Sequence, residues 1–400
     1  MISALAVTAA CLPLYVVRFR IGPLPTSLLE VLILVTTACY LAVLWTESRL
    51  PAARTPYDIP IVLLLIAGVI GILAAPDHTR ALGIYRAYFV EAIVCFYIAV
   101  DILRTPKDLR IFLFIAAAGS CVMAIGQIVS FTYVAAHHQL QLGDAPAFLN
   151  TTPNAVAMYL EPPLAFAVGF TMFPAQPRER WIAAFATTLI LIAIILTLSR
   201  ASYLSMSVLA VILVLSLQGR RWRLRAVAAL AALALVVLEI PFVNHRFLDL
   251  AHSVTNRTSI YHQALQMLAQ RPITGAGISG FPIRVAPFRP AIQAVQLYPH
   301  DIWLTTWSEI GLLGVLAFGV IFFGLLWRGA RGLASAAGLD RPILWGSVGA
   351  LVLYTVHGLV DSPYWKNDLS VEFWLLAALQ VVALRGLSLS GAGPQAGISP

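Results

Sequence analysis

Charged residues are scarce in this chain of 400 residues. Only 11% of the residues are charged, whereas 60% are hydrophobic. An ordinary soluble domain carries roughly 25% charged residues, so this composition could not cover a water-facing surface. The length points the same way, because a single soluble core rarely grows beyond about 300 residues. The composition therefore excludes a soluble globular domain and indicates an integral membrane protein.

Several chemical signatures are also absent. The four cysteines fall inside apolar runs without CxxC spacing: Cys11, Cys39, Cys95 and Cys121. We expect them to be buried thiols rather than disulfide partners or metal ligands. The eight histidines include no HExxH or other ligand spacing, so we expect neither a metal nor another cofactor. No Asp-x-Asp pair occurs, which disfavours a nucleotide-sugar transferase that holds its diphosphate through a cation.

Apolar runs of about the length of a membrane span recur along the chain. They lie at about 2–17, 27–46, 58–75, 83–103, 109–135, 153–173, 181–198, 201–217, 225–241, 302–327, 342–360 and 370–387. Long, unalternating runs indicate helices, because only helices or closed barrels satisfy the backbone in hydrocarbon. The N-terminal run lacks the basic stretch of a cleaved signal peptide, so we expect a helix there as well. The sequence predicts an all-α integral membrane protein with about 12 transmembrane helices.

One long segment interrupts this series. Residues 1–241 hold helices one to nine, and residues 302–387 hold helices ten to twelve. Between them, residues 242–301 form one long loop with short helices. The Gly/Ser/Pro-rich residues 388–400 are typical of a disordered tail.

The basic residues predict the orientation of the helices. The net charge of +8 does not indicate a nucleic-acid partner, because the 26 basic residues are spread between the apolar runs. Fifteen of the 26 fall in one set of alternating loops and 11 in the other, of which five lie in the long loop. Long loops contribute little to orientation, so the short loops divide 15 to 6. We expect both termini in the cytoplasm and the long loop on the outer face of the cytoplasmic membrane.

A glycine-rich segment in the long loop has the literal pattern GxGxxG, at Gly275, Gly277 and Gly280. A dinucleotide site needs a strand before this pattern and a helix after it. The preceding segment, residues 256–270, is instead periodic and helical, and Pro282 follows. We therefore interpret the glycines as a tight turn that lets the backbone approach a ligand or a helix.

Two arginines are candidate anion ligands. Arg257 follows a Thr255/Asn256 helix cap, so we expect it in a first helical turn, where backbone N–H groups favour an anion. A solvated surface charge explains Arg257 as well. Arg200 lies between two apolar runs, where an arginine costs about 2.5–3.5 kcal/mol on insertion scales. Either an anionic partner offsets that cost, or the side chain extends to the membrane interface.

His300 opens the segment PHDIWLTTWSEIGLLG, at the junction between the long loop and the next helix. A histidine can remove a proton from a hydroxyl near neutral pH, and a polar anchor at the interface is the alternative. Further along this helix we expect Glu309 to be a buried polar partner, and Gly311 and Gly314 to be helix-packing positions.

Together these segments resemble the O-antigen ligase / O-antigen polymerase superfamily of bacterial membrane glycosyltransferases. The similar segments are SRAS at 199–202, Arg257 with YHQALQMLAQRPITGAGISGF, and PHDIWLTTWSEIGLLG. PNAVAMYL at 153–160 and HGLVDSPYWKNDLSVEFW at 357–374 are also similar, so the resemblance spans about residues 150–380. Asp301 departs from the Asn that is usual in the family, and we expect its charge beside His300 to raise the histidine pKa.

The resemblance implies a substrate and roles for residues. The family acts outside the inner membrane, without a metal, on saccharides carried by undecaprenyl diphosphate. Arg200 and Arg257 would bind the diphosphate, and His300 would assist the acceptor hydroxyl. Arg80 and Arg86, in another outward loop, are weaker candidates for the same diphosphate, since a helix-flanking role explains both equally well.

The sequence therefore predicts a glycosyltransferase of cell-surface polysaccharide or lipopolysaccharide biosynthesis. It would move a saccharide from undecaprenyl diphosphate to a hydroxyl of a saccharide or glycolipid acceptor, among membrane lipids and without nucleic acid. A ligase is slightly preferred over a polymerase of the same superfamily. A lipid-linked saccharide transporter or flippase and a structural subunit are the alternatives from other classes.

Overall fold

The computed structural model describes residues 1–22, 24–51, 54–137, 139–140, 145–217, 219–239 and 250–391. The fold is helical, as predicted, and the strands within these ranges are a single antiparallel hairpin. Most of the predicted tail, residues 392–400, lies outside the described residues, and the last helix extends to Gly391.

The N-terminal run does not form the spanning helix that its composition predicts. Helix α1 (Ile2–Ala10) has nine residues, a length of about 14 Å, and a 3₁₀ turn follows at Leu12–Val16. Pro13 lies in the first turn of that 3₁₀ segment and has no backbone N–H with which to continue the α-helix. The chain then reverses through β1 (Arg18–Ile21) and β2 (Leu24–Ser27), with Arg18 opposite Ser27.

Helices of 17 residues or more cover the other eleven predicted runs. In the first half they are α2 (Leu28–Thr46), α3 (Asp58–Ala74), the continuous helix His78–Ile102, α6 (Pro106–Ala136), α7 (Pro153–Met172) and α8 (Pro177–Ile195). The helix His78–Ile102 comprises α4 (His78–Tyr85), a π-helical turn (Arg86–Val90) and α5 (Glu91–Ile102). In the second half they are α9 (Arg200–Ser216), α10 (Arg220–Leu238), α14 (Ile302–Gly332), α15 (Asp340–Gly358) and α16 (Asn367–Gly391).

Six of the described helices are long and apolar enough to cross a membrane: Leu28–Thr46, His78–Ile102, Pro106–Ala136, Pro153–Met172, Ile302–Gly332 and Asn367–Leu387. Helices α3 and α9 are apolar but have only 17 residues each. The fold is therefore that of a multi-pass membrane protein.

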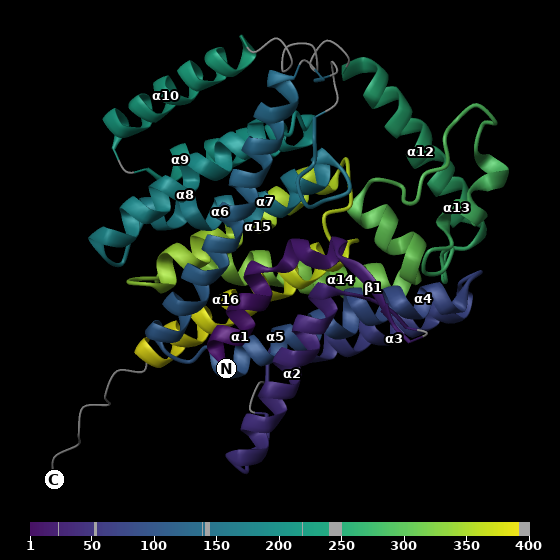
Figure 1. Cartoon of the computed structure of the whole chain (residues 1–400), viewed down its shortest axis with the longest axis horizontal. Coiled ribbons are helices and arrows are strands. Elements are labelled where there is room, and N and C mark those ends of the chain that lie inside the picture. Colours follow the sequence, from purple (N-terminus) through teal and green to yellow (C-terminus); the bar gives the residue numbers. More distant parts are fainter. Residues whose placement is uncertain are drawn as a thin grey trace.

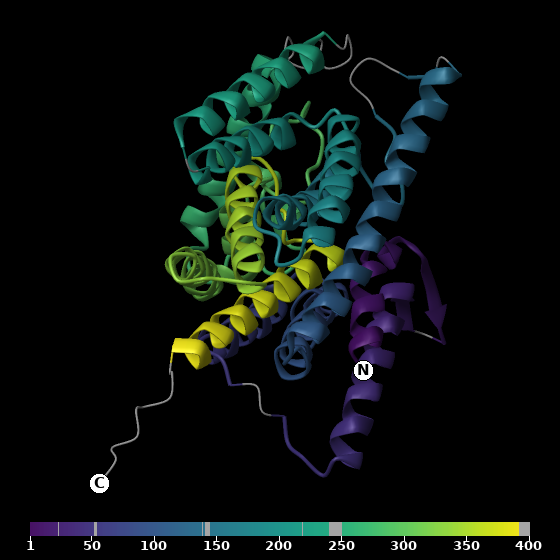
Figure 2. The ribbon, with the colours of Figure 1, turned by 90° about the vertical axis from the view of Figure 1, so that its left-hand side faces the viewer.

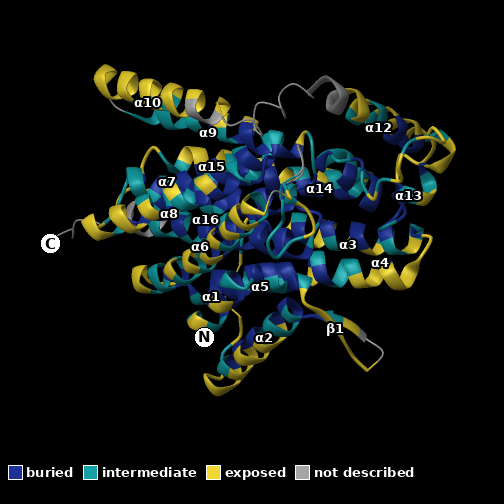
Figure 3. Cartoon of the chain, turned by 45° about the horizontal axis from the view of Figure 1, so that its top comes forward, coloured by how far each residue is buried: buried dark blue, intermediate teal, exposed yellow. Residues whose placement is uncertain are grey.

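The helices pack as one bundle around α14, α15 and α16. Helix α15 packs on α7 and α9, α16 on α5, and α14 on α3. Helix α16 is buried along most of its length, whereas α10 is exposed along almost its whole length (Figure 3). In Figure 2, α16 crosses the bundle obliquely, and α6 extends beyond it at the Ala136 end.

The predicted long loop contains α12 (Leu250–Gln270), the short α13 (Phe281–Arg284) and a 3₁₀ turn (Ala286–Phe288). These elements lie at the end of the bundle that also carries α4 (Figure 1). Helix α12 begins at Leu250, so the expected cap at Thr255 and Asn256 is wrong, and Arg257 does not lie in a first turn. The helix starts earlier because residues 250–254, LAHSV, contain no helix breaker.

Aromatic packing holds the loop between α15 and α16, residues 359–366, on top of α14. The Tyr364 ring lies 5.1 Å from the Phe318 ring, and Trp365 Nε1 donates to Thr306 Oγ1 at 3.1 Å. The hydroxyls of Thr305 and Ser362 are 2.7 Å apart. This loop is therefore fixed against the first turns of α14, directly after His300.

Candidate functional site

His300 immediately precedes the N-cap of α14 and has an unusual backbone conformation. Its φ of +61° lies in the left-handed region, which a non-glycine residue adopts only when its surroundings hold it there. The ring has two polar neighbours: Nδ1 is 3.3 Å from Asp361 Oδ1, and Nε2 is 3.0 Å from Gln296 Oε1. The side chain is 31% exposed, so the ring lies at the edge of the bundle and can be reached from outside.

Asp361 is the acidic partner of this histidine. It lies in the 359–366 loop, where its carboxylate also accepts hydrogen bonds from Asn154 Nδ2 and from the Ser362 N–H at 2.8 Å. Burial alone would raise the pKa of the Asp361 carboxyl. The hydrogen bond to His300 and the positive charges of His300, His357 and Arg257 outweigh burial and hold that pKa well below its usual range.

Asn154 connects Asp361 to the segment that carries Arg200. Its side-chain nitrogen donates to Asp361, and its side-chain oxygen accepts from Ser199 Oγ. Ser199 is the N-cap of α9 and receives the Ser202 N–H, so Arg200 is the first residue of a 17-residue helix. Arg200, rather than Arg257, therefore lies at a helix N-terminus, where backbone N–H groups favour an anion.

Arg257 approaches the same place from α12. Its charge lies close enough to Asp361 and His357 to affect both. Its Nη1 atom is buried and has no hydrogen-bond partner among the described residues. One turn further along α12, the Tyr261 hydroxyl lies 3.0 Å from the His300 carbonyl and 2.7 Å from the Leu359 carbonyl. The structure thus brings Arg257, His300 and Asp361 together, and Asn154 and Ser199 link them to Arg200.

The two weaker arginine candidates have different surroundings. Arg86 pairs with two carboxylates, Glu30 at 2.5 Å and Glu91 at 3.2 Å, so its charge is already balanced within the bundle. Arg80 is exposed on α4 and lies within electrostatic range of Glu309 and Tyr298. Of the two, only Arg80 keeps a charge that no described carboxylate pairs with directly.

The glycine-rich segment forms the tight turn that its sequence predicts. Gly275 (φ +66°) and Gly277 (φ +80°) allow the loop to approach the backbones of α14 and α3, where a Cβ atom would lie within 2.5 Å of main-chain atoms. The Ala276 N–H donates to the Ser308 carbonyl at 2.7 Å, and the Leu312 N–H donates to the Ile273 carbonyl at 2.9 Å. These bonds satisfy backbone groups where α14 is broken at Ile310 and Gly311.

Glu309 and Gly311 belong to this junction. Glu309 is fully buried and accepts the Ser279 N–H at 2.5 Å, so its prediction as a buried polar partner is confirmed. Gly311 has a φ of +70°, and its Cα faces the Ile273 carbonyl. Gly311 therefore breaks α14 and packs against loop backbone rather than against another helix as predicted, and a Cβ atom at Gly314 would meet the Ile310 side chain of the same helix.

Asp301 has a different role from the one its sequence position indicates. Its carboxylate caps α14 by accepting the N–H groups of Trp303 at 2.9 Å and Leu304 at 2.7 Å. The carboxylate that contacts the His300 ring is Asp361. Among the described residues, no three His, Cys, Asp or Glu side chains gather as possible metal ligands.

Sequence reasoning missed Asn154, Tyr261 and Asp361 as site residues. All three lie in segments that resemble the family, PNAVAMYL, YHQALQ and HGLVDSPYW. Their polar side chains within otherwise apolar or packed segments are the signal that could have identified them.

The long apolar helices and the cluster at one end of the bundle define a multi-pass membrane protein with a polar site near its surface. Residues 183–319 match the family model described as O-antigen ligase. The chain therefore carries a domain of the O-antigen ligase family, and the predicted resemblance is confirmed over this range. The range includes Arg200, Arg257 and His300, whereas Asn154 and Asp361 lie outside it. No curated protein matches the chain.

Proposed function

We propose that this protein is a glycosyltransferase that moves a saccharide from undecaprenyl diphosphate to an acceptor hydroxyl at the outer face of the cytoplasmic membrane. The proposal is supported above all by the buried Nη1 of Arg257, which has no described partner and lies beside the His300–Asp361 pair. A buried guanidinium nitrogen without a hydrogen-bond partner is costly, and a diphosphate oxygen would satisfy it. The family domain at residues 183–319 supports a lipid-linked saccharide as substrate.

The proposed reaction uses His300 as the base. With Nδ1–H donated to Asp361, Nε2 carries the lone pair that accepts the proton of the acceptor hydroxyl. Asp361 orients the ring and stabilises the imidazolium that forms, as a buried carboxylate does in other histidine-based sites. Gln296 lies beside Nε2, and in this tautomer its amide must present the NH2 group rather than Oε1 to the Nε2 lone pair until the hydroxyl takes that position.

The arginines act on the leaving group. The acceptor oxygen bonds to the anomeric carbon while the bond from that carbon to the diphosphate oxygen breaks. The electron pair stays on the diphosphate, and the proton passes to His300 and then to water. Arg200 and Arg257, with the N-terminal N–H groups of α9, stabilise the added negative charge. Arg80 is a further candidate for binding the diphosphate. Arg86 is already paired with Glu30 and Glu91, so it is not included among the diphosphate ligands.

Product analysis tests this function. The purified protein is given lipid-linked oligosaccharide with and without a saccharide or glycolipid acceptor. We expect single transfer to the added acceptor, which is the ligase reaction, and transfer is lost in Arg257→Gln. A ladder of products without acceptor would instead assign the polymerase reaction. Movement of the substrate across vesicles without a covalent product would overturn the proposal in favour of a transporter.

A matched control variant shows whether the loss of transfer in Arg257→Gln comes from the site itself or only from removing one positive charge from the loop. Arg271 is exposed in the same predicted outward segment, and its backbone, rather than its guanidinium, bonds to the glycine turn through the Gly275 N–H. Arg271→Gln removes the same charge as Arg257→Gln and is expected to keep normal transfer.

A further inference from the structure

A groove of about 560 Å³ lies between α6, α7, α8 and α16. Its walls are almost entirely apolar and include Phe112, Phe166, Phe170, Ile190, Leu375 and Leu379. Phe114 and Ile182 line its rim and are 62% and 54% exposed, so the groove opens sideways between α6 and α8. In a membrane, a chain of a neighbouring lipid has direct access to it.

The depth of the groove corresponds to one leaflet. Arg110 and Ser120 both line it, and ten residues of helix rise about 15 Å. The hydrocarbon core of a bilayer is about 30 Å thick, so the groove reaches from one surface to the middle. The buried residues Tyr159 and Glu372 close its inner end. This depth fits one acyl chain of a lipid in that leaflet better than a much longer polyprenyl chain.

The mouth of the groove is cationic. The first turns of α6 and α8 meet there, joined by the Arg110–Glu179 ion pair at 2.8 Å. Four basic residues gather at these two helix starts against two acids: Lys107, Arg110, Arg178 and Arg180, with Asp108 and Glu179.

Both acids at the mouth are already engaged. Asp108 accepts the Thr105 N–H at 2.9 Å, and Glu179 accepts the Gln176 N–H at 3.0 Å in addition to pairing with Arg110. Lys107, Arg178 and Arg180 are exposed and have no carboxylate partner among the described residues. Together with the two helix N-termini, they create a positive potential that suits an anionic headgroup.

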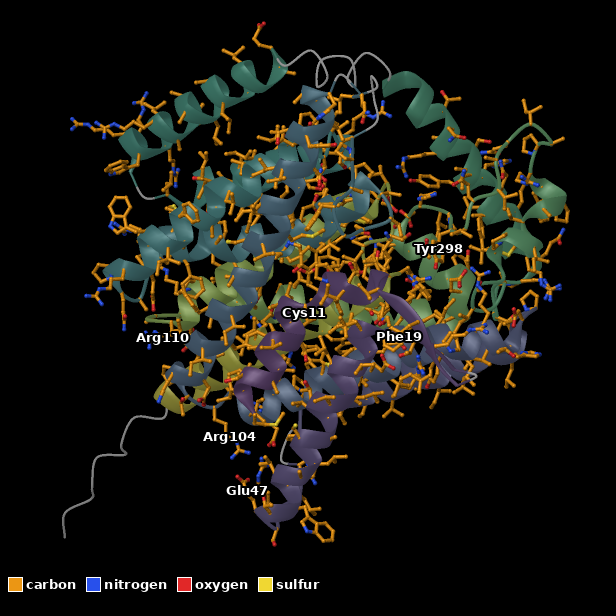
Figure 4. The ribbon with its side chains drawn as sticks, viewed as in Figure 1. Cys11, Phe19, Glu47, Arg104, Arg110 and Tyr298 are labelled. Carbon is orange, nitrogen blue, oxygen red and sulfur yellow. The ribbon has the colours of Figure 1, made fainter. Side chains whose placement is uncertain are left out.

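We propose that this groove binds one acyl chain of an anionic phospholipid, with the lipid phosphate at the Arg110–Arg178 mouth. In Figure 4, Arg110 lies at the left-hand edge of the molecule, and Tyr298, which precedes His300 by two residues, lies to the right of its centre. The lipid site is therefore separate from the proposed transfer site, and it is independent of the proposed function.

Headgroup selectivity provides the test. The delipidated full-length protein in detergent is titrated with phosphatidylglycerol or phosphatidylcholine of identical chains, and bound lipid is counted by native mass spectrometry. We expect phosphatidylglycerol to bind about tenfold more tightly, because its headgroup carries a net negative charge that the basic residues attract, whereas the choline cation offsets the phosphate charge of phosphatidylcholine. The double variant Arg178→Gln/Arg180→Gln is expected to lose this preference. The matched double variant Arg328→Gln/Arg331→Gln, which removes two exposed arginines outside the groove, is expected to keep it.

A second variant tests the acyl chain itself. Ala117 is exposed and lines the groove, so Ala117→Phe fills space without disturbing the core. We expect it to weaken the binding of both lipids and to leave the melting temperature unchanged. Equal binding of the two headgroups, full binding by Ala117→Phe, or tighter binding of undecaprenyl phosphate in competition would overturn the proposal. Because binding is measured without any saccharide donor, a failure here leaves the proposed transfer reaction unaffected.

Discussion

The imidazole of His300 and the carboxylate of Asp361 are 3.3 Å apart although 61 residues separate them in the chain. Helices α14 and α15 lie between them in sequence, and the 359–366 loop returns to the first turn of α14. Asp361 is itself held by Asn154 from α7, so three distant segments converge on one histidine. Such convergence fixes both the position and the orientation of the ring, which general-base catalysis requires.

Asp361→Asn is expected to lower kcat by about 10²–10³-fold with little change in KM for the lipid-linked donor. The amide keeps the shape of the side chain but removes the charge that stabilises the imidazolium. Steady-state transfer assays on the purified variant measure kcat and KM separately and so test this prediction. An unchanged kcat would show that Asp361 only shapes the loop.

Asp361 also predicts how stability depends on pH. Its folded-state pKa lies below its usual range, so its contribution to stability is present above the unfolded value of about 3.9 and is lost as the pH falls below it. The wild type is therefore expected to melt higher than Asp361→Asn at pH 7, with the difference shrinking below about pH 4. Melting curves of the wild type and of Asp361→Asn in detergent, recorded at pH 7 and below about pH 4, test this prediction. The pKa of Asp301 is raised by burial, so the difference between the wild type and Asp301→Asn should change with pH in the opposite direction.

Tyr261→Phe is expected to reduce kcat about five- to tenfold while KM stays the same. The variant removes one hydroxyl that contacts the His300 and Leu359 carbonyls, a loss of about 1 kcal/mol. Tyr133→Phe is the control, since Tyr133 is 60% exposed on α6, away from these contacts. A Tyr261→Phe enzyme with unchanged kcat would mean that packing alone positions His300.

The helices could largely be predicted from the sequence because hydrocarbon leaves the backbone few alternatives. Eleven of the predicted runs carry long helices, and the glycine turn followed from Pro282 and the absence of a strand before it. The early end of α1 was not predicted, because the prediction of a spanning helix relied on the apolar composition of residues 2–17 and ignored the helix-breaking effect of Pro13. Asn154, Tyr261 and Asp361 were missed for a different reason. Their importance comes from contacts made between segments 39 to 207 residues apart, and no local pattern encodes such contacts.

Arg86→Gln distinguishes a structural arginine from a substrate ligand. We expect it to destabilise the protein by about 1–3 kcal/mol, because Glu30 and Glu91 would remain largely buried without their partner. Per folded molecule, transfer activity should stay near normal. The double variant Arg86→Gln/Glu30→Gln should recover part of the melting temperature. A stable Arg86→Gln protein with a greatly raised KM for the donor would instead place Arg86 at the diphosphate.

The proposed orientation of the helices can be tested by labelling single cysteines in intact cells. Ile292, in the predicted outward loop, is 99% exposed, and Trp222, in the predicted cytoplasmic loop, is 60% exposed. In a background lacking the four native cysteines, Ile292→Cys is expected to react with a membrane-impermeant maleimide. Trp222→Cys should react only after the cells are opened, because the arginines around it favour the cytoplasmic side. The reverse pattern would place the His300 site in the cytoplasm, where a transfer reaction at the outer face is impossible.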